Sequence, residues 1–221
     1  MIMKPKDFFE FYENFNLRFS KELDKLNIGI LSGFCKNKEV VFEFNCKYIE
    51  PNKPKIVICG INPGRFGAGK TGIPLLDFPS LSKILPNMNE IPHEKPEKSA
   101  KFIFSIIEHF GVNDFFKQFY LTNISCIGFY CTKTKKNINY YELPLSIQYF
   151  LFDNFSKEIN YIKPKIIIPL GKEVEKNLIM DLKHEHKINT EIGTRLPHPS
   201  TRYARKDDYI KLLEQYSYKY K

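Results

Sequence analysis

Two short apolar runs constrain the fold of this chain more than any other feature of its sequence. KIVICGI (55–61) and KIIIPLG (165–171) consist mostly of β-branched aliphatic residues, and glycine or proline lies near the end of each run. Apolar runs without polar alternation are typical of strands that are buried on both faces of a parallel sheet. The two runs are therefore expected to be neighbouring core strands.

Helices are expected around these strands, because apolar residues recur there at intervals of three and four. The expected helices cover residues 7–23, 99–110, 145–161 and 172–182, with another near the C-terminus. Further strands are expected at EVVFEF (39–44), within FYLTNISCIGF (119–129) and near INTEIG (188–193), with loops over 62–96 and 131–139. This alternation predicts an α/β fold with a doubly wound parallel sheet, formed by a single domain over 1–221. Its ligand site should lie beyond the carboxyl ends of the strands.

The charge of the chain favours a polyanionic partner. Lys and Arg total 34 against 25 for Asp and Glu, a formal net charge of +9. Nucleic acid suits such a balance, although a Lys-rich surface is also a common means of solubility. Four of the five arginines fall in two short segments that also hold Gly or Pro, namely Arg65 in the first and Arg195, Arg202 and Arg205 in the second. Arginine's planar fork of donors suits phosphate, so both segments are candidate binding loops.

The five cysteines indicate no metal centre, because they form no C-x-x-C pair. We expect ordinary thiols, no metal and no cofactor. The N-terminal residues include acids where a signal peptide needs an apolar stretch, and no run approaches the ~18 apolar residues of a membrane span. The chain is therefore expected to be intracellular (cytoplasm or nucleoid), monomeric and without a membrane partner.

The segment GRFGAGKT (64–71) matches the phosphate-binding pattern G-x-x-x-x-G-K-[ST]. In a phosphate loop the Lys-Thr pair opens a helix, whose amides hold the phosphates. Here Gly72 and Pro74 follow at once, and the next residues show no sustained helical period. NTP binding is kept as an alternative that this local sequence disfavours.

The longer segment GINPGRFGAGKTGIP resembles the first motif of the uracil-DNA glycosylase superfamily, most closely that of the single-strand-selective monofunctional (SMUG-like) uracil-DNA glycosylases. LPHPSTR (196–202) is similar to the H-P-S-x-R motif of that family, and YLTNISC (120–126) lies where the family carries a base-reading Asn. The three motifs occur in the family's order. The resemblance implies a three-layer α/β/α fold around a mostly parallel four-stranded sheet.

The resemblance also implies an active site that hydrolyses the N-glycosidic bond of uracil in DNA. Asn62 matches the residue that positions the attacking water, and His198 matches the residue that faces uracil O2, where it stabilises the departing base. Asn123 matches the residue that reads uracil N3–H and O4. The implied base-binding surface comprises Gly60, Ile61, Gly64, Phe66, Leu75 and Asn123. Gly64 lies where a small residue would leave room for a C5 substituent.

Two residues of the first segment depart from the family pattern. Leu75 stands where the family places a base-stacking Phe, so Phe66 or Phe78 is considered as the stacking partner instead. Asp77 has no evident counterpart, and it is either a second water-activating group or an ordinary loop acid.

The second Arg-bearing segment is expected to enter DNA as the base leaves. Arg202 matches the family's penetrating Arg, and the implied wedge also includes Ser200, Thr201, Tyr203 and Arg205. The sequence therefore predicts a monofunctional DNA glycosylase of base excision repair, with C5-modified uracils as further candidate substrates. The alternatives are a P-loop NTP-binding protein and a basic nucleic-acid-binding domain without catalysis.

Overall fold

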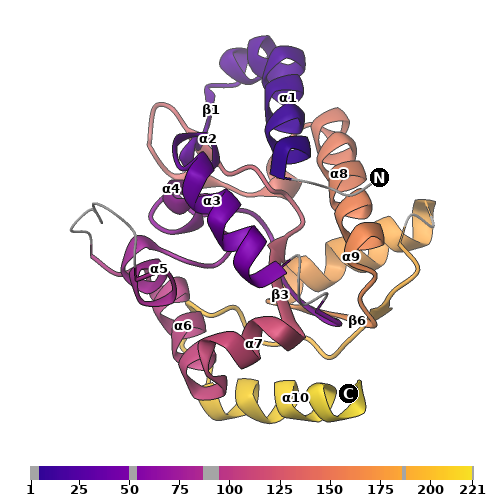
Figure 1. The fold of residues 1–221 in the computed structure, drawn as a ribbon. Coiled ribbons are helices and arrows are strands. Elements are labelled where there is room, and N and C mark those ends of the chain that lie inside the picture. Colours follow the sequence, from indigo (N-terminus) through magenta and orange to yellow (C-terminus); the bar gives the residue numbers. More distant parts are fainter. Residues whose placement is uncertain (1–4, 50–53, 87–94, 186–187, 221) are drawn as a thin grey trace.

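The structure is a computed structural model whose centre is a four-stranded, fully parallel sheet in the order β3-β2-β6-β7 (Figure 1). The described residues are 5–49, 54–86, 95–185 and 188–220. The strands are β2 (Ile56–Gly60), β3 (Phe119–Asn123), β6 (Ile166–Pro169) and β7 (Glu191–Ile192). β2, β3 and β6 are buried throughout. The two apolar runs thus form the adjacent strands β2 and β6, as predicted.

Helices cover both faces of this sheet, as Figure 1 shows. One layer contains α6 (Lys98–Phe110), α7 (Val112–Gln118) and α10 (Lys206–Lys219); the other contains α8 (Leu145–Ile162) and α9 (Lys172–Glu185). Side chains of β3 show this division, because Phe119 packs on the rings of Phe110 and Phe115, whereas Thr122 bonds to Glu158 of α8. The predicted three-layer α/β/α fold is confirmed. Among the described helices, none has the length and apolar character needed to cross a bilayer.

A second, three-stranded antiparallel sheet lies beside the first Arg-bearing segment, residues 60–74. It consists of β1 (Ile28–Ile30), β4 (Phe129–Cys131) and β5 (Asn137–Ile138). Helix α1 (Pro5–Lys25) packs on it, with the ring centroids of Phe15 and Phe129 5.9 Å apart. The Lys-rich stretch predicted to be a loop therefore forms the β4–β5 hairpin, with its lysines in an exposed turn.

The prediction of a strand at EVVFEF is wrong. These residues belong to α3 (Lys38–Phe44), which follows the short α2 (Gly33–Lys36) and leads into the π-helix η1 (Asn45–Ile49). Val41, Phe44 and Tyr48 are buried, and a spacing of three and four places them on one helical face. Tertiary packing thus selects the helical period over the β-branched composition.

The stretch predicted to be a long loop contains two helices in its described part. They are α4 (Ala68–Thr71) and α5 (Phe78–Ile84), and residues 87–94 lie outside the described residues. The sequence after Pro74 shows no sustained helical period, yet α5 forms there. Pro79 lies in its first turn, where a backbone N–H would have no partner within the helix and its absence is tolerated.

A buried carboxyl group, Glu158, lies between α8 and the sheet. Its Oε1 accepts a 2.5 Å hydrogen bond from the Thr122 hydroxyl, and the Tyr120 hydroxyl also bonds to it. Burial raises the pKa of Glu158 from 4.5 to about 7, although these two hydrogen bonds oppose the shift. The folded protein therefore binds a proton here that the unfolded chain releases near pH 4.5.

This shift predicts that Glu158 destabilises the fold increasingly as the pH rises from about 4.5 to about 7. Glu158→Gln keeps the shape and removes the titration. We expect the free energy of unfolding of the variant minus that of the wild type to rise across this window, by up to ~3 kcal/mol at 1.4 kcal/mol per pH unit. Denaturant unfolding at several pH values measures it, and a difference that does not change with pH would contradict the prediction.

Candidate active site

The candidate site begins where β2 and β3 end side by side. Gly60 pairs with Asn123, and the ladder continues as Ile124 and Ser125 donate their amides, both at 3.0 Å, to the carbonyls of Gly60 and Ile61. A Cβ at position 60 would lie 2.3 Å from Oδ1 of Asn123 and 3.4 Å from Cδ2 of Leu75. The structure thus brings together Gly60, Leu75 and Asn123, three of the predicted base-binding residues, with the backbone of Ile61 next to them.

The amide of Asn123 has an unused donor. The residue is 2% exposed, and among the described residues its Nδ2 is the one buried side-chain N or O atom without a hydrogen-bond partner. Leaving such a donor unpaired costs roughly 1–3 kcal/mol, so native structures rarely contain one without a reason. A ligand with an acceptor atom would satisfy it.

Asn62 follows β2 at the carboxyl edge of the sheet and is held by the β5 segment. Its Oδ1 accepts the amide of Tyr140 at 2.9 Å, and its Nδ2 lies 3.4 Å from the carbonyl oxygens of Pro63 and Ile138. These contacts fix the plane of the side-chain amide. One lone pair of Oδ1 remains for a further donor, because an amide oxygen accepts two.

His198 lies beyond the sheet edge in the loop between β7 and α10. Its Nδ1 accepts the amide of Ser200 at 3.3 Å and lies 2.9 Å from that residue's hydroxyl oxygen. An Nδ1 that accepts a backbone amide places the proton of the neutral ring on Nε2. Burial lowers the pKa of His198 below its ordinary 6.5, while the nearby Glu97 opposes the shift. The ring is therefore neutral at pH 7 and carries an Nε2–H donor.

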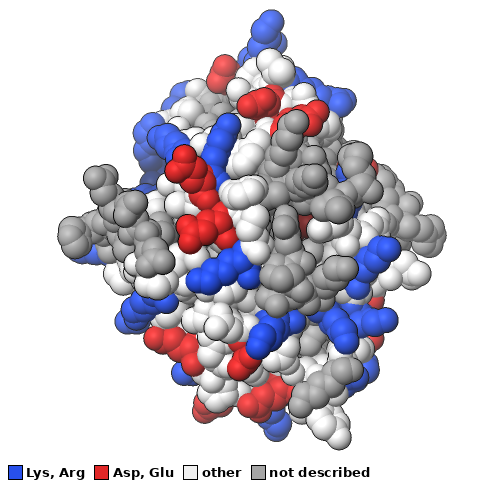
Figure 2. Space-filling view, viewed as in Figure 1, with Lys and Arg blue, Asp and Glu red and all other residues white. Residues whose placement is uncertain are grey.

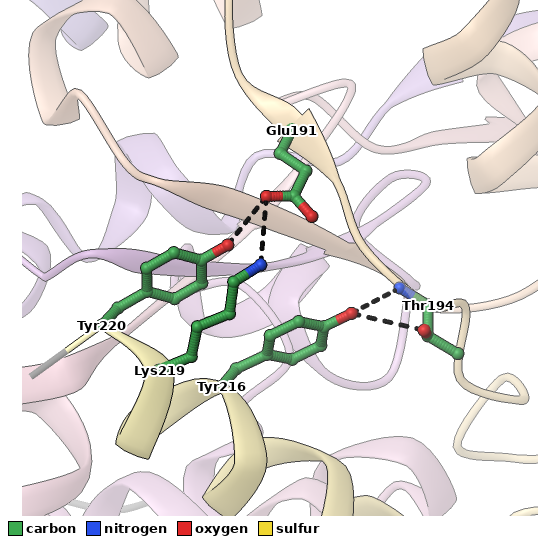
Figure 3. A network of polar contacts seen from close by, with 5 residues as sticks. All are labelled: Glu191, Thr194, Tyr216, Lys219 and Tyr220. Atoms are coloured by element: carbon green, nitrogen blue, oxygen red, sulfur yellow. Dashed lines mark hydrogen bonds and ion pairs between the residues drawn. The ribbon is translucent and has the colours of Figure 1, made fainter.

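Helix α10 anchors the loop that carries His198. The buried Tyr209 hydroxyl donates to the carbonyl of Pro197, and Tyr216 bonds through its hydroxyl to the amide of Thr194 at 2.9 Å (Figure 3). In the same figure Tyr220 and Lys219 both reach the carboxylate of Glu191 on β7. No sequence pattern indicates these tyrosine contacts, because they join residues that only the fold brings together.

The residues predicted to form the wedge follow His198 in an exposed turn. The hydroxyl of Thr201 donates to the carbonyl of His198 at 2.8 Å. The guanidinium of Arg202 stacks 4.9 Å from the ring of Tyr203, which is 64% exposed, and donates to its hydroxyl at 2.7 Å. Arg205 is the N-cap of α10. The predicted wedge residues thus form one exposed surface beside His198.

Phe66 and Gly64 lie between Asn62 and α4. Phe66 is 54% exposed, with the Arg65 guanidinium 4.3 Å from its ring centroid, and it lines a separate cavity. Phe78, the other stacking candidate, is buried at the start of α5. A Cβ at Gly64 would meet one atom, Nδ2 of Asn137 at 3.7 Å, so there is space beside it.

Asp77 is not an ordinary loop acid. It is 1% exposed, its Oδ1 caps α5 by accepting the amide of Ser80 at 2.9 Å, and its Oδ2 accepts the amide of Glu97 at 2.7 Å. Both oxygens thus bind backbone, and Asp77 fastens the first segment to the start of α6. This arrangement gives no support to a role in activating water.

The phosphate-loop pattern lacks the geometry of a phosphate loop. Lys70 and Thr71 end the four-residue α4 instead of opening a helix, and Gly72 follows with a φ of 82°. Thr71 is fully buried, and its hydroxyl donates to the carbonyl of Leu76 at 2.9 Å, so it is not available to a metal ion. The described part of the chain also contains no group of three His, Cys, Asp or Glu residues able to hold a metal. The P-loop alternative therefore has no structural support.

Positive charge alone does not locate a binding face. On the side shown in Figure 2, the Lys and Arg side chains of described residues are dispersed, with acidic side chains among them. The position of the site rests instead on the local contacts of Asn62, Asn123 and His198.

Comparisons with known proteins give a matching family profile and a similar solved structure. A profile of the uracil DNA glycosylase superfamily matches residues 46–217. The crystal structure of wild-type SMUG2 from Pedobacter heparinus superposes with a TM-score of 0.70 at 27% sequence identity, covering 88% of this chain and 87% of that one. A comparison with curated proteins gave no match.

The buried Thr71 and the short α4 predict that ATP does not bind. Thermal unfolding with and without Mg²⁺-ATP should give the same midpoint for the wild type and for Lys70→Ala, because a ligand that binds only the folded state raises the midpoint. An ATP-dependent rise in the wild type that Lys70→Ala abolishes would restore the P-loop alternative.

Proposed function

The chain belongs to the uracil DNA glycosylase superfamily, and from this premise we propose that it removes uracil from DNA by hydrolysing the N-glycosidic bond, leaving an abasic site. The observation that carries the proposal is the buried, unpaired Nδ2 donor of Asn123, a residue whose Oδ1 lies against Gly60 at the carboxyl ends of the central strands. This is where ligands bind in open α/β sheets.

Asn123 supplies the hydrogen bonds that distinguish uracil. Uracil presents N3–H as a donor and O4 as an acceptor, and a carboxamide offers the matching acceptor and donor. The unpaired Nδ2 would bind O4, and Oδ1 would accept N3–H. Cytosine presents the reverse order and would leave both groups mismatched in a buried site.

His198 stabilises the leaving group in this proposal. Its neutral Nε2–H would donate to uracil O2, where negative charge develops as the bond to the sugar breaks. A donor already held by the Ser200 amide needs no reorganisation during the reaction, which is the basis of electrostatic catalysis. The lowered pKa keeps the ring in this form at neutral pH.

Asn62 positions the attacking water. Tyr140 fixes the side-chain amide, and the remaining lone pair of Oδ1 would accept a hydrogen bond from the water that attacks the anomeric carbon. No lysine amine is required as a nucleophile, so the proposed enzyme is monofunctional, without strand cleavage.

Leu75 takes the place of an aromatic residue against the base. Its side chain lies beside Gly60, next to Asn123, where it would cover one face of uracil through apolar contact. The open space beside Gly64 leads us to include C5-substituted uracils among the substrates. Arg202 and the exposed ring of Tyr203 would occupy the gap that the extruded nucleotide leaves in duplex DNA.

The direct test is release of uracil from a labelled oligonucleotide under single-turnover conditions. Asn62→Ala and His198→Ala should each lower the rate constant by roughly 10² to 10³, as loss of one preorganised group typically does. Asn177→Ala on α9 and His109→Ala on α6 remove the same side chains from the surface and should leave the rate unchanged. Wild-type rates in both site variants would show that the active site lies elsewhere. DNA binding by the wild type without base release would support the non-catalytic alternative.

Asn123→Asp tests base reading. An ionised carboxylate offers acceptors only, so uracil O4 would face a negative charge without a donor in a buried pocket. Uracil excision should fall by ~10² to 10⁵, the range that buried donor mismatches produce. The measurement compares uracil and cytosine release on otherwise identical oligonucleotides, with Asn177→Asp as the charge control and circular dichroism as the check on folding. Undiminished uracil release would make Asn123 a structural residue.

A further inference from the structure

A cavity adjoins the loop that carries His198. Its volume is about 580 Å³, in the range of ~300–1,000 Å³ that small-molecule sites occupy. Three segments line it, and they contribute Phe66 and Lys70 from the first segment, Lys95, Glu97 and Lys98 from the start of α6, and Ser200 from the loop after His198.

The lining of this cavity suits a nucleotide phosphate. Lys70, Lys95 and Lys98 come from two different segments, and Glu97 is the one acid among the lining residues that the structure describes. Oε2 of Glu97 already accepts the amide of Ala100 at 2.8 Å, which caps α6. The cavity therefore has an excess of positive charge, which attracts phosphate.

The lining also offers a surface for a base. Phe66 is 54% exposed, so its ring is accessible to a ligand in this cavity. The Arg65 guanidinium stacks 4.3 Å from its ring centroid, and the Arg65 amide and guanidinium bond to Asn137 and Lys135 of the β4–β5 hairpin. Arg65, which the hairpin holds in position, thus contacts one side of the Phe66 ring. Nucleic-acid bases stack on exposed aromatic rings regardless of base sequence.

The cavity shares a wall with the catalytic candidate His198. Oγ of Ser200 lies 2.9 Å from Nδ1 of His198. Glu97, which also lines the cavity, is close enough to His198 to act on it electrostatically. A nucleotide in this cavity would consequently lie directly beside a uracil bound against His198 and Asn123.

We infer that this cavity binds the nucleotide next to the target uracil in the same DNA strand, with its phosphate on the three lysines and its base on Phe66. The inference rests on the proposed function, because it places the uracil in the neighbouring pocket. Such a site would bind single-stranded DNA independently of the wedge residues. It also assigns a DNA-binding role to Lys70.

The test uses single-stranded oligonucleotides of one length and charge with uracil at the centre, at the 5′ end or at the 3′ end. One of the two end positions removes the neighbour that fills the cavity. Single-turnover rates against enzyme concentration give the half-saturating concentration for each substrate. For the wild type this value should be roughly tenfold higher when that neighbour is missing, since stacking of one base contributes ~1–3 kcal/mol.

The triple variant Lys70→Gln/Lys95→Gln/Lys98→Gln should raise the half-saturating concentration roughly tenfold on the central-uracil substrate. The slope of the logarithm of its binding constant against the logarithm of the salt concentration should fall in magnitude by about 0.7, the value for one phosphate contact on a single strand. On the substrate without the neighbour, this variant and the wild type should agree. Phe66→Ala should likewise raise the half-saturating concentration on the central-uracil substrate and match the wild type on the substrate without the neighbour. Lys25→Gln/Lys157→Gln/Lys176→Gln removes three exposed lysines from α1, α8 and α9 and should affect all substrates equally.

Equal losses on all three substrates would overturn the inference, and so would a thermal shift with dTMP or ATP that the lysine variant removes, since the cavity would then bind free nucleotides. Binding of the same oligonucleotides with an abasic-site analogue in place of uracil is measured in parallel by fluorescence anisotropy. If the wild type releases no uracil, the proposed function fails, whereas the neighbour dependence of binding still tests this cavity.

Discussion

The parallel pairing of β2 with β3 is the constraint on which the site depends. Its register places Gly60 opposite Asn123, and the ladder continues for two more hydrogen bonds into the residues that follow. The Asn123 amide then lies directly over Gly60, at a distance that any side chain larger than hydrogen would occupy. A register shift of one residue would turn Asn123 to the opposite face of the sheet, toward α8 and Glu158. The glycine and the register together therefore hold a buried polar group that the rest of the core does not satisfy.

The sequence predicted the parts of the fold that depend on local pattern. The runs that form β2 and β6 are apolar on both faces, so a sheet covered by helices on both sides is the environment that buries them. The order of the motifs predicted that Asn62, Asn123 and His198 lie at the carboxyl edge of that sheet. It failed where packing between distant residues decides. α3 has a strand-like composition but buries Val41, Phe44 and Tyr48 along one helical face, and the β4–β5 hairpin depends on pairing with β1.

Helix α10 explains how a loop residue such as His198 can be held in position. Loops that carry functional groups need support from rigid elements. Tyr209 reaches the carbonyl of Pro197, immediately before the histidine, and burial raises the pKa of this tyrosine, so its hydroxyl remains a donor. Tyr216 fixes Thr194 further back. A helix that follows the loop in sequence thus supports it in space, and the geometry of His198 depends on residues that have no contact with the base.

The match to the phosphate-loop pattern is explained by the structure of the turn that carries Leu75. Thr71 accepts the amide of Ile73 at 3.1 Å and donates to the carbonyl of Leu76 at 2.9 Å, so its hydroxyl closes the turn between α4 and α5. Within that turn Leu75 has a φ of 62°, a left-handed conformation that costs a branched side chain roughly 1–3 kcal/mol. The closed turn holds this strained residue so that its side chain reaches Gly60 and Asn123. Thr71 therefore supports Leu75, one of the residues proposed to contact the base, and its position after Gly69 and Lys70 produces the phosphate-loop pattern without the corresponding site.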